Sequence, residues 1–509
     1  MQSIKPIETD VVELSVSAWF YRNRTIAGFD NPARSLYVSI RELVENSLDA
    51  SEEAGYLPDV SVTLSRTSKQ SDSADLFSAG PEEFKLKVVD NGGGIPKDKV
   101  PKLIGKMLTG TKFMLRQNRG TFGLGGSLAL LYGQVTTQKP IRILTALEGQ
   151  DVQHELVMRL DIEKNKPRII EEQTYSKNPS VHGTTVEFSL QGDWLRSKTR
   201  IADYFTQTSI IVPYADIEFK NPDGEKLTFH RIIETLPKQP KDMKPHPEGI
   251  DVEMLKQMIR KTSKRTLAKF FNRAFQRVGK TIAHAFLEYA GFDADTSPKT
   301  LNREELVELM NAMSSYDKFL PPSPKSLSPA GEDVIEAGLR RLEPEFVAVT
   351  TRSPSVYEGH PFIIETAIAY GGNLSPGISL FRFANRIPLL YDERSDVSSR
   401  VIRDLHLKHY DLKSEDPLVF LTHICSTKVP YKTVGKEFIG DVDAVRREVD
   451  LGFKECLRRI SEGVRKKNRA KRKARRENKL QNYYEFLAET LSAATGRKIT
   501  HTVLFEKER

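Results

Sequence analysis

The period of apolar positions changes several times along the chain, and each change marks a predicted element. Asn31 followed by Pro32 predicts the start of a helix that runs to about Ala54, where Gly55 ends it. On this helix Glu42, Asn46 and Asp49 fall in one narrow sector. The opposite sector is mostly apolar: Leu36, Ile40, Leu43, Val44, Ser47 and Leu48. The polar stripe is either a solvated face or the floor of a site, and Glu45, farther round the helix, is expected to be solvated.

Strand patterns follow this helix. The segment "LPDVSVTLSR" alternates, a polar insertion "TSKQSDSADLFSAG" comes next, and "EFKLKVVD" alternates again. Beyond a glycine-rich stretch, "SLALLYG" predicts a short helix, and further strands are expected around "IRILTALEG", "HELVMRLDI", "TTVEFSL" and "ADIEFKNP". Roughly the first 235 residues are therefore predicted to form an α+β sandwich.

Two proline-rich stretches divide the rest of the chain. "LPKQPKDMKPHPEG" precedes a basic helical region from Ile250 to about Ser315, and "FLPPSPKSLSP" opens another mixed region. That region ends in a predicted long helix with apolar residues spaced by three and four: Val445, Val449, Phe453, Leu457, Ile460 and Val464. A separate short helix is expected after it, with the apolar stripe Leu480, Tyr484, Leu487 and Leu491, and is predicted to dock on a partner.

Composition and charge narrow the class of protein. The chain has 509 residues, 39% hydrophobic and 28% charged, which predicts a soluble protein of two to four domains. Its net charge of +9 comes from one run, "RKKNRAKRKARR" at 465–476: without its nine basic residues the remaining 68 equal the 68 acidic ones. The run is either a solvated helix face or a surface for nucleic acid or an acidic partner. No signal-peptide pattern or long apolar run is evident, and only two cysteines are present, so a reducing cytoplasm and no structural zinc are expected.

Three glycine-containing segments carry the candidate chemistry. In "VVDNGGGIP", Asp90 ends a strand before a tight turn that includes Gly92 and Gly94. In "RGTFGLGGSLALL", glycines precede a helix N-terminus, which aims backbone N–H groups at phosphate. In "VHGTTVEF", Gly183 and Thr184 begin a strand. Each pattern alone is commonly structural, but their order after an E-x-x-x-N-x-x-D helix is hard to reach by chance.

In these motifs the sequence resembles the GHKL ATPase superfamily. The resemblance implies that Glu42 is the general base for the attacking water, that Asn46 binds Mg²⁺, and that Asp90, with Thr184, binds the adenine of ATP. The physical reading agrees, because a carboxylate beside an amide can polarise water and hold a hydrated Mg²⁺. The lid over the phosphates would span Gly120 to Gly126. The full set of implied cofactor-binding residues is Asn46, Asp49, Asp90, Gly92, Gly94, Thr111, Lys112, Gly120, Thr121, Phe122, Gly123, Leu124, Gly125, Gly126, Ser127, Thr184 and Lys436.

Two other patterns imitate known sites. "AFQRVGKT" at 274–281 matches a loose P-loop, but a P-loop needs a preceding strand, whereas this segment is predicted to continue a helix. "GDVDAV" places Asp441 and Asp443 like a paired-acid metal centre, but no supporting α/β repeat accompanies it. We interpret it as the cap of the long helix.

Within the superfamily, "RELVENSLDASEEAG", "RVGKTIAHAFLEYAG" and "STKVPYKTVGKEFIGDVDAVRREV" resemble the B subunits of DNA topoisomerase VI, a type IIB enzyme. The resemblance covers nearly the whole chain and implies an ATPase domain with an N-terminal strap at 1–237, a helix–two-turns–helix domain at 238–318, a transducer domain with a ribosomal S5-like fold at 319–476, and a C-terminal docking helix at 477–509. It also implies a transducer lysine that reaches the γ-phosphate. Lys436 fits that position best, with Lys432 as the rival. The lid departs from the family in lacking a more polar residue before its second glycine, and the insertion after the first strand is additional.

The resemblance implies an ATP-gated clamp. ATP would draw the strap, around Trp19 to Asp30, onto a second copy, and Lys436 would couple the γ-phosphate to a transducer rotation. A separate A subunit, in an A2B2 heterotetramer, would cut both DNA strands, in the cytoplasm at the nucleoid. Phosphate-facing residues are expected in the helical domain: Lys261, Lys264, Arg265, Lys269, Arg273 and Arg277, the alternative being a solvated basic surface. The rival function is a mismatch-repair-like or chaperone-like clamp ATPase without a topoisomerase partner.

Overall fold

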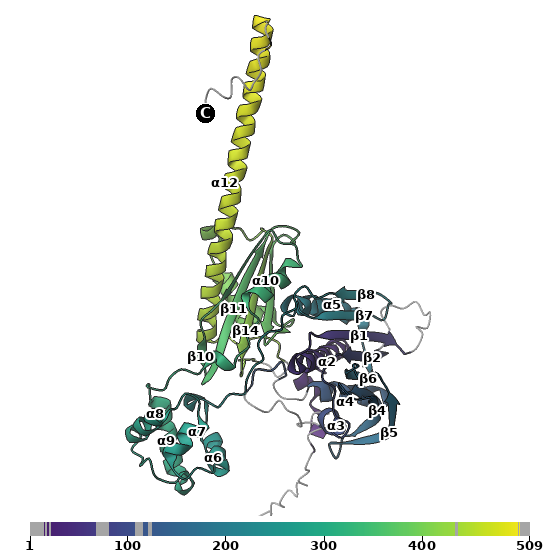
Figure 1. Ribbon diagram of the computed structural model, residues 1–509, viewed down its shortest axis with the longest axis vertical. Coiled ribbons are helices and arrows are strands. Elements are labelled where there is room, and N and C mark those ends of the chain that lie inside the picture. Colours follow the sequence, from purple (N-terminus) through teal and green to yellow (C-terminus); the bar gives the residue numbers. More distant parts are fainter. Residues whose placement is uncertain are drawn as a thin grey trace, which may run out of the picture.

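The computed structural model describes residues 15, 18–19, 22–67, 81–106, 116–120, 125–432, 436–496 and 498. Two β-sheets organise it, one in the N-terminal half and one in the C-terminal half (Figure 1). A group of four helices lies apart from both sheets, and the last helix extends far beyond the rest of the molecule (Figure 1). Of the described helices, none has the length and apolar character needed to cross a membrane.

The N-terminal sheet has eight strands in the order β5-β4-β3-β6-β2-β1-β7-β8, and every neighbouring pair is antiparallel except β1 and β7. The strands are β1 (Asp59–Arg66), β2 (Glu82–Asp90), β3 (Ile141–Ala146), β4 (Val152–Asp161), β5 (Lys166–Ser176), β6 (Gly183–Gly192), β7 (Asp216–Lys220) and β8 (Lys226–Phe229). The helices are α2 (Pro32–Ala54), α3 (Val100–Gly105), α4 (Gly125–Thr137) and α5 (Trp194–Ile211), and α2 and α4 pack on β6. The predicted α+β sandwich is therefore confirmed.

Helix α2 begins and ends where the sequence predicts. The side chain of Asn31 accepts a hydrogen bond from the Arg34 amide, and Pro32 occupies the first turn. Gly55 ends the helix in the left-handed conformation, with φ of 84°. Most of the helix is buried, because α4 and α5 cover it on either side. Within the polar stripe Glu42 is buried, Asp49 is half-buried and Asn46 is exposed, so the stripe is only partly solvated.

The four helices α6 (Val252–Lys261), α7 (Leu267–Ala274), α8 (Lys280–Tyr289) and α9 (Arg303–Ser315) form their own hydrophobic core around Phe271, Phe275 and Phe286. The P-loop-like segment lies here, and the prediction that a helix runs through it was wrong: α7 ends at Ala274, and residues 275–279 form a turn before α8. A helix rather than a strand precedes that turn, so the structure agrees that it is not a P-loop.

The transducer sheet has six strands, ordered β10-β11-β14-β12-β13 with β9 also paired to β11. They are β9 (Phe346–Thr351), β10 (Ser355–Tyr357), β11 (His360–Tyr370), β12 (Ile378–Ala384), β13 (Ile387–Pro388) and β14 (Leu418–Ser426), accompanied by α10 (Glu332–Arg340), α11 (Val397–Asp404) and α12 (Asp443–Thr495). Six short 3₁₀ turns complete the described elements: Arg24–Ala27, Pro247–Gly249, Pro298–Thr300, Pro324–Ser326, Glu393–Ser395 and Leu407–Tyr410.

Helix α12 corrects two predictions. Its 53 residues are continuous through the basic run, so the separate C-terminal helix beginning at 477 is part of the same helix. Asp441 does not cap it with its side chain but ion-pairs with Arg400 and Arg446. The predicted apolar face is confirmed, since all six of its residues from Val445 to Val464 are buried against the sheet.

The ATPase and transducer parts share one hydrophobic core, which includes Ile335, Leu339 and Phe383 of the transducer along with the residues around α2. The approach between α10 and α5 is so close that a Cβ at Gly338 would collide with the Ile210 carbonyl. The two parts therefore pack as one body in this arrangement, and side chains of the transducer are within reach of α2.

Candidate nucleotide site

The floor of the candidate site is the central part of α2. Glu42 is buried, with 8% of its surface exposed, and Nη2 of Arg41 lies 2.6 Å from its Oε1. Asn46, one turn later, is exposed. The start of α4 covers both residues: a Cβ at Gly125 would collide with the Glu42 carboxylate, and one at Gly126 would lie 2.8 Å from Asn46 Nδ2. Only glycine permits this approach, which explains the glycine pair in the sequence.

Asp90, at the end of β2, forms a second wall. Its Oδ1 accepts hydrogen bonds from the amides of Gly92 and Thr184 at 2.9 and 3.0 Å, and its Oδ2 accepts from the Ser47 hydroxyl at 3.1 Å. Burial raises the pKa of Asp90, an effect that these donors oppose. The predicted partnership of Asp90 with Thr184 is thus present as a backbone contact.

Two glycines make this wall possible. Gly94 has φ of 71°, and a Cβ there would collide with the Ala146 carbonyl. Gly183 has φ of 125°, and a Cβ there would collide with the carbonyl of Asp90 itself. Each position has a positive φ and no room for a Cβ, so only glycine fits there. The turn that presents the Asp90 carboxylate depends on both residues.

Lys436 reaches this region from the transducer. It is 7% exposed, adopts φ of 55°, and its Nζ donates a hydrogen bond to the Arg119 carbonyl at 3.1 Å. The next residue, Glu437, ion-pairs with Arg34 in the first turn of α2. The rival Lys432 is exposed and its side chain packs along Gly440. Of the two lysines, Lys436 is the one held against the base of the lid.

Glu45 corrects a prediction, because it is 3% exposed rather than solvated. Burial, followed by the nearby charge of Glu42, raises its pKa to about 7. Nε of Arg41 lies 3.5 Å from Oε1 of Glu45, and neither carboxylate oxygen has a hydrogen-bond partner among the described residues. A second carboxyl therefore lies beside Glu42, and it is protonated more readily than an ordinary glutamate.

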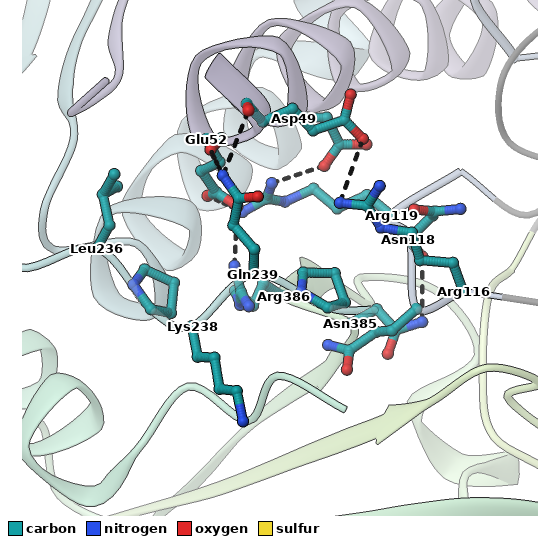
Figure 2. A pocket seen from close by; sticks show the side chains of 14 residues that line it. Asp49, Glu52, Arg116, Asn118, Arg119, Leu236, Lys238, Gln239, Asn385 and Arg386 are labelled. Atoms are coloured by element: carbon teal, nitrogen blue, oxygen red, sulfur yellow. Dashed lines mark hydrogen bonds and ion pairs between the residues drawn. The ribbon is translucent and has the colours of Figure 1, made fainter. Parts of the chain in front are cut away.

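Asp49 does not face Arg41, as Glu42 and Glu45 do, but pairs with Arg119 from the segment before the lid. Its Oδ1 accepts a hydrogen bond from Arg119 Nη1 at 2.8 Å, and Arg119 Nη2 lies 2.6 Å from Glu52. Glu52 also pairs with Arg386 of the transducer at 2.8 Å. Figure 2 shows these four side chains around a pocket between α2, the segment before the lid and the turn at Asn385. Asp49 thus supports the site through Arg119.

The other predicted residues fall into two groups. Gly120 is the first residue of the predicted lid and is described, and Ser127 lies in α4, where its hydroxyl donates to the Ile104 carbonyl at 3.2 Å. Thr111, Lys112, Thr121, Phe122, Gly123 and Leu124 lie outside the described residues.

Sequence reasoning missed three arginines. Arg41 precedes the proposed base directly, and its position in "RELVEN" was a usable signal. Arg119 and Arg386 had no local signal, because they meet Glu52 only through the tertiary fold.

A buried cluster of Glu365, His423 and Cys425 has spacing that could hold a metal ion. Its hydrogen bonds explain it without one: His423 Nδ1 donates to Glu365, which also accepts from the Ala330 and Gly331 amides.

Comparison with known proteins identifies the family. The sequence profile of the topoisomerase VI B subunit transducer matches residues 322–476, and that of the histidine kinase-, DNA gyrase B- and HSP90-like ATPases matches residues 31–192. The B subunit of type 2 DNA topoisomerase 6 from Metallosphaera sedula is 40% identical over 484 residues, which cover 94% of this chain and 89% of that protein. The chain belongs to the family of type 2 DNA topoisomerase 6 B subunits.

Other relatives agree with this assignment. The corresponding B subunit from Saccharolobus solfataricus is 40% identical over 90% of this chain and 86% of its own. Membership makes the chain an ATP-dependent type II topoisomerase subunit, and the relatives do not favour the mismatch-repair-like or chaperone-like alternative.

Among solved structures, the N-terminal domain of a DNA repair protein covers 84% of this chain at 12% identity and a TM-score of 0.42, with 95% of that domain matched. The 43K ATPase domain of Thermus thermophilus gyrase B covers 91% of this chain at 12% identity and a TM-score of 0.38, with 98% of that domain matched.

Proposed function

We propose that ATP binds between α2, the Asp90 turn and the start of α4, and that Glu42 is the general base of its hydrolysis. The observation that carries this proposal is the convergence of three segments on one helix. Ser47 of α2 bonds Asp90, Asn46 of α2 lies under Gly126, and Asp49 of α2 holds Arg119, whose carbonyl accepts from Lys436. Helix α2 therefore carries the proposed general base Glu42 and supports both Asp90, the proposed adenine acceptor, and Lys436, the proposed phosphate-binding lysine.

Asn46 would hold magnesium in this site. Its amide oxygen is a hard ligand of the kind Mg²⁺ accepts, and the Asn46 side chain is exposed, so a phosphate-bound ion could reach it. Bound Mg²⁺ would neutralise part of the phosphate charge. Deep burial beside Arg41 keeps the Glu42 carboxylate oriented toward the same space.

Within this arrangement each residue has a distinct task. Glu42 accepts a proton from the water that attacks the terminal phosphate. Asp90 accepts a hydrogen bond from the adenine amino group. Lys436 leaves the Arg119 carbonyl for the terminal phosphate, so that the transducer registers whether that phosphate is present.

The chain acts as one part of a larger enzyme. Two copies would dimerise through the strap around Trp19 to Asp30 when ATP binds, and a separate A subunit would make the double-strand break. The end of α12 is the proposed docking surface for that subunit, since Tyr483 and Phe486 there are 60% and 67% exposed. Clamp closure would then drive a second DNA duplex through the break.

DNA contacts are proposed on the helical domain. All six basic side chains singled out on α6, α7 and the turns after them are exposed: Lys261, Lys264, Arg265, Lys269, Arg273 and Arg277. They would bind backbone phosphates without sequence preference, and each contact contributes about 0.9 to the slope of log affinity against log salt. Reversing Lys264, Lys269 and Arg273 should flatten that slope. An unchanged slope would assign these residues to a solvated surface.

The experiment that tests the ATPase assignment is Glu42→Ala. ATP binding should persist within a few fold, because Asp90 and the backbone contacts remain, whereas turnover should fall by about a thousandfold with the loss of the general base. Binding is measured by nucleotide titration and turnover by phosphate release. Unchanged turnover in this variant would sink the assignment.

A further inference from the structure

The two-residue turn between β12 and β13 is unusual in its backbone. Asn385 and Arg386 both have positive φ, 48° and 66°; asparagine is common at the first position of such a hairpin, but glycine would be the ordinary choice at the second. A bulky arginine in this conformation is strained, and such strain persists only where surrounding contacts hold it. These contacts come from two directions.

The transducer fixes the turn from behind. The Asn385 amide makes two hydrogen bonds with the Ser426 backbone at 2.9 and 3.0 Å, and the Arg386 N–H donates to His423 Nε2 at 3.0 Å. His423 is held in turn by Glu365 at 2.8 Å. The buried Glu365–His423 pair therefore serves as an anchor for the Arg386 backbone.

On its other side, the turn contacts the ATPase part through an ion pair and hydrogen bonds. Arg386 Nη1 lies 2.8 Å from Glu52 near the end of α2, and its Nη2 bonds the Ser328 carbonyl at 3.1 Å. Asn385 Nδ2 donates to the Asn118 carbonyl at 3.1 Å. Figure 2 shows Asn385 and Arg386 pointing toward Asn118 and the Arg119–Glu52 pair. One turn of the transducer thus contacts both α2 and the segment that leads into the lid.

The segment 116–120, which leads into the predicted lid, is bonded to the transducer at three consecutive residues. Gln117 makes two hydrogen bonds with the Ser328 backbone at 2.7 and 2.9 Å. The carbonyl of Asn118 accepts from Asn385, and the carbonyl of Arg119 accepts from Lys436. Glu52 joins the two arginines, because it pairs with Arg119 and Arg386 at once. Burial alone would raise the pKa of Glu52, but Arg119 and then Arg386 hold it below its ordinary value.

We propose that Arg386 is a positioning residue of the nucleotide site: through Glu52 and Arg119 it fixes the segment 116–120, and so places the base of the lid and Lys436 together. This role rests on the proposed function of Lys436. It adds a second transducer contact, separate from the lysine, to the machinery that registers nucleotide. Arg386 acts through other side chains and not on ATP itself.

The test is a double-mutant cycle on ATP turnover by the full chain. Arg386→Gln should lower kcat about tenfold with Lys436 present, and less than twofold in the Lys436→Ala background, because its effect runs through the placement of that lysine. Arg382→Gln is the matched control. Arg382 is also a buried transducer arginine, but it pairs with Asp396 inside the transducer rather than with a residue of α2. Its effect should be the same in both backgrounds.

Glu52→Gln keeps the side-chain shape and provides a second variant if Arg386→Gln fails to fold. It should give the same non-additive pattern, with the thermal midpoint measured in parallel. An equal loss in both backgrounds, or no loss in either, would overturn the positioning role while Glu42→Ala remains inactive. Equal turnover by the wild type and Glu42→Ala would instead overturn the proposed function, and the role of Arg386 with it.

Discussion

Helix α2 carries two groups of shielded acidic side chains, Glu42 with Glu45 and Asp49 with Glu52, and the two groups differ in how fully arginines balance their charge. Toward the proposed nucleotide site, Glu42 and Glu45 share Arg41, and burial raises the pKa of Glu45 to about 7. Toward the transducer, Asp49 and Glu52 face Arg119 and Arg386, and the pKa of Glu52 is lowered. Both groups lie on one helix, among side chains that are largely shielded from solvent.

The difference follows from what each end is for. A buried ion pair with matched charges stabilises one arrangement and resists change when one partner is removed. A site with excess carboxylate is costly in the absence of ligand and responds to cations and protons. The transducer end of α2 therefore acts as a fixed joint, and the end that contains Glu42 and Glu45 is the one that we propose binds ATP and Mg²⁺.

Asp90→Asn should weaken ATP binding more than any other single substitution considered for this site. Its Oδ1 already accepts two amide hydrogen bonds, so Asn must turn its NH₂ toward the place of Oδ2, where Ser47 and the adenine amino group also donate. The Ser47 hydroxyl can rotate to accept from this NH₂, but the adenine amino group would then face a donor in place of its acceptor, which should weaken ATP binding about a hundredfold. Nucleotide titration measures this, with Asp59→Asn on β1 as a control. Affinity within threefold of wild type would place adenine elsewhere.

Lys436→Ala should have a smaller effect, on turnover more than on binding. The lysine is buried against the Arg119 carbonyl, so its loss should lower kcat by roughly ten- to a hundredfold through lost charge stabilisation of the phosphate. The matched control is Lys432→Ala, four residues earlier and exposed, which should change kcat less than twofold. The reverse ranking of the two variants would assign the phosphate to Lys432.

Glu45→Gln should have the smallest effect on ATP binding and turnover, and its effect should be seen instead in stability against pH. The groups facing Glu45 are Arg41, Glu42 and Asp49 on α2 and Lys436 from the transducer, with Tyr204 and Tyr431 packed nearby. Because its pKa rises from 4.5 to about 7 on folding, the wild type loses stability as pH rises through this window, by up to roughly 3 kcal/mol.

The glutamine variant lacks that loss. It should therefore unfold at a higher temperature than wild type at pH 8, and at nearly the same temperature at pH 5. Thermal unfolding at the two pH values measures this. A difference between wild type and variant that is equal at both pH values would show that Glu45 does not titrate in the window.

The sequence predicted the bounds of α2 and the glycine turns near it better than the buried side-chain contacts along the helix. The bounds of α2 follow from local signals, the Asn31 cap, Pro32 and Gly55, and the glycine turns around Asp90 follow from backbone conformation. Glu45 was missed because the groups that bury it include Tyr431 and Lys436, which are distant in sequence. Arg386 lies in a turn whose own residues carry no glycine or proline signal.

Secondary structure was missed where periodicity was weak. Strand β5 is exposed along nearly its whole length, including Ile169 and Ile170, so no buried face marked it. The break predicted within α12 came from the end of its apolar stripe. The helix continues because Lys, Arg, Ala, Glu and Leu, which dominate 465–495, are strong helix formers even without a packed face.

The central claim, that ATP turnover by this chain drives DNA strand passage, is tested most directly by relaxation of supercoiled plasmid. The full chain is combined with a topoisomerase VI A subunit and Mg²⁺, with and without ATP, beside Glu42→Ala. We expect relaxation by the wild type only when ATP is present and none by the variant. Relaxation that proceeds equally with Glu42→Ala, or without nucleotide, would contradict the account.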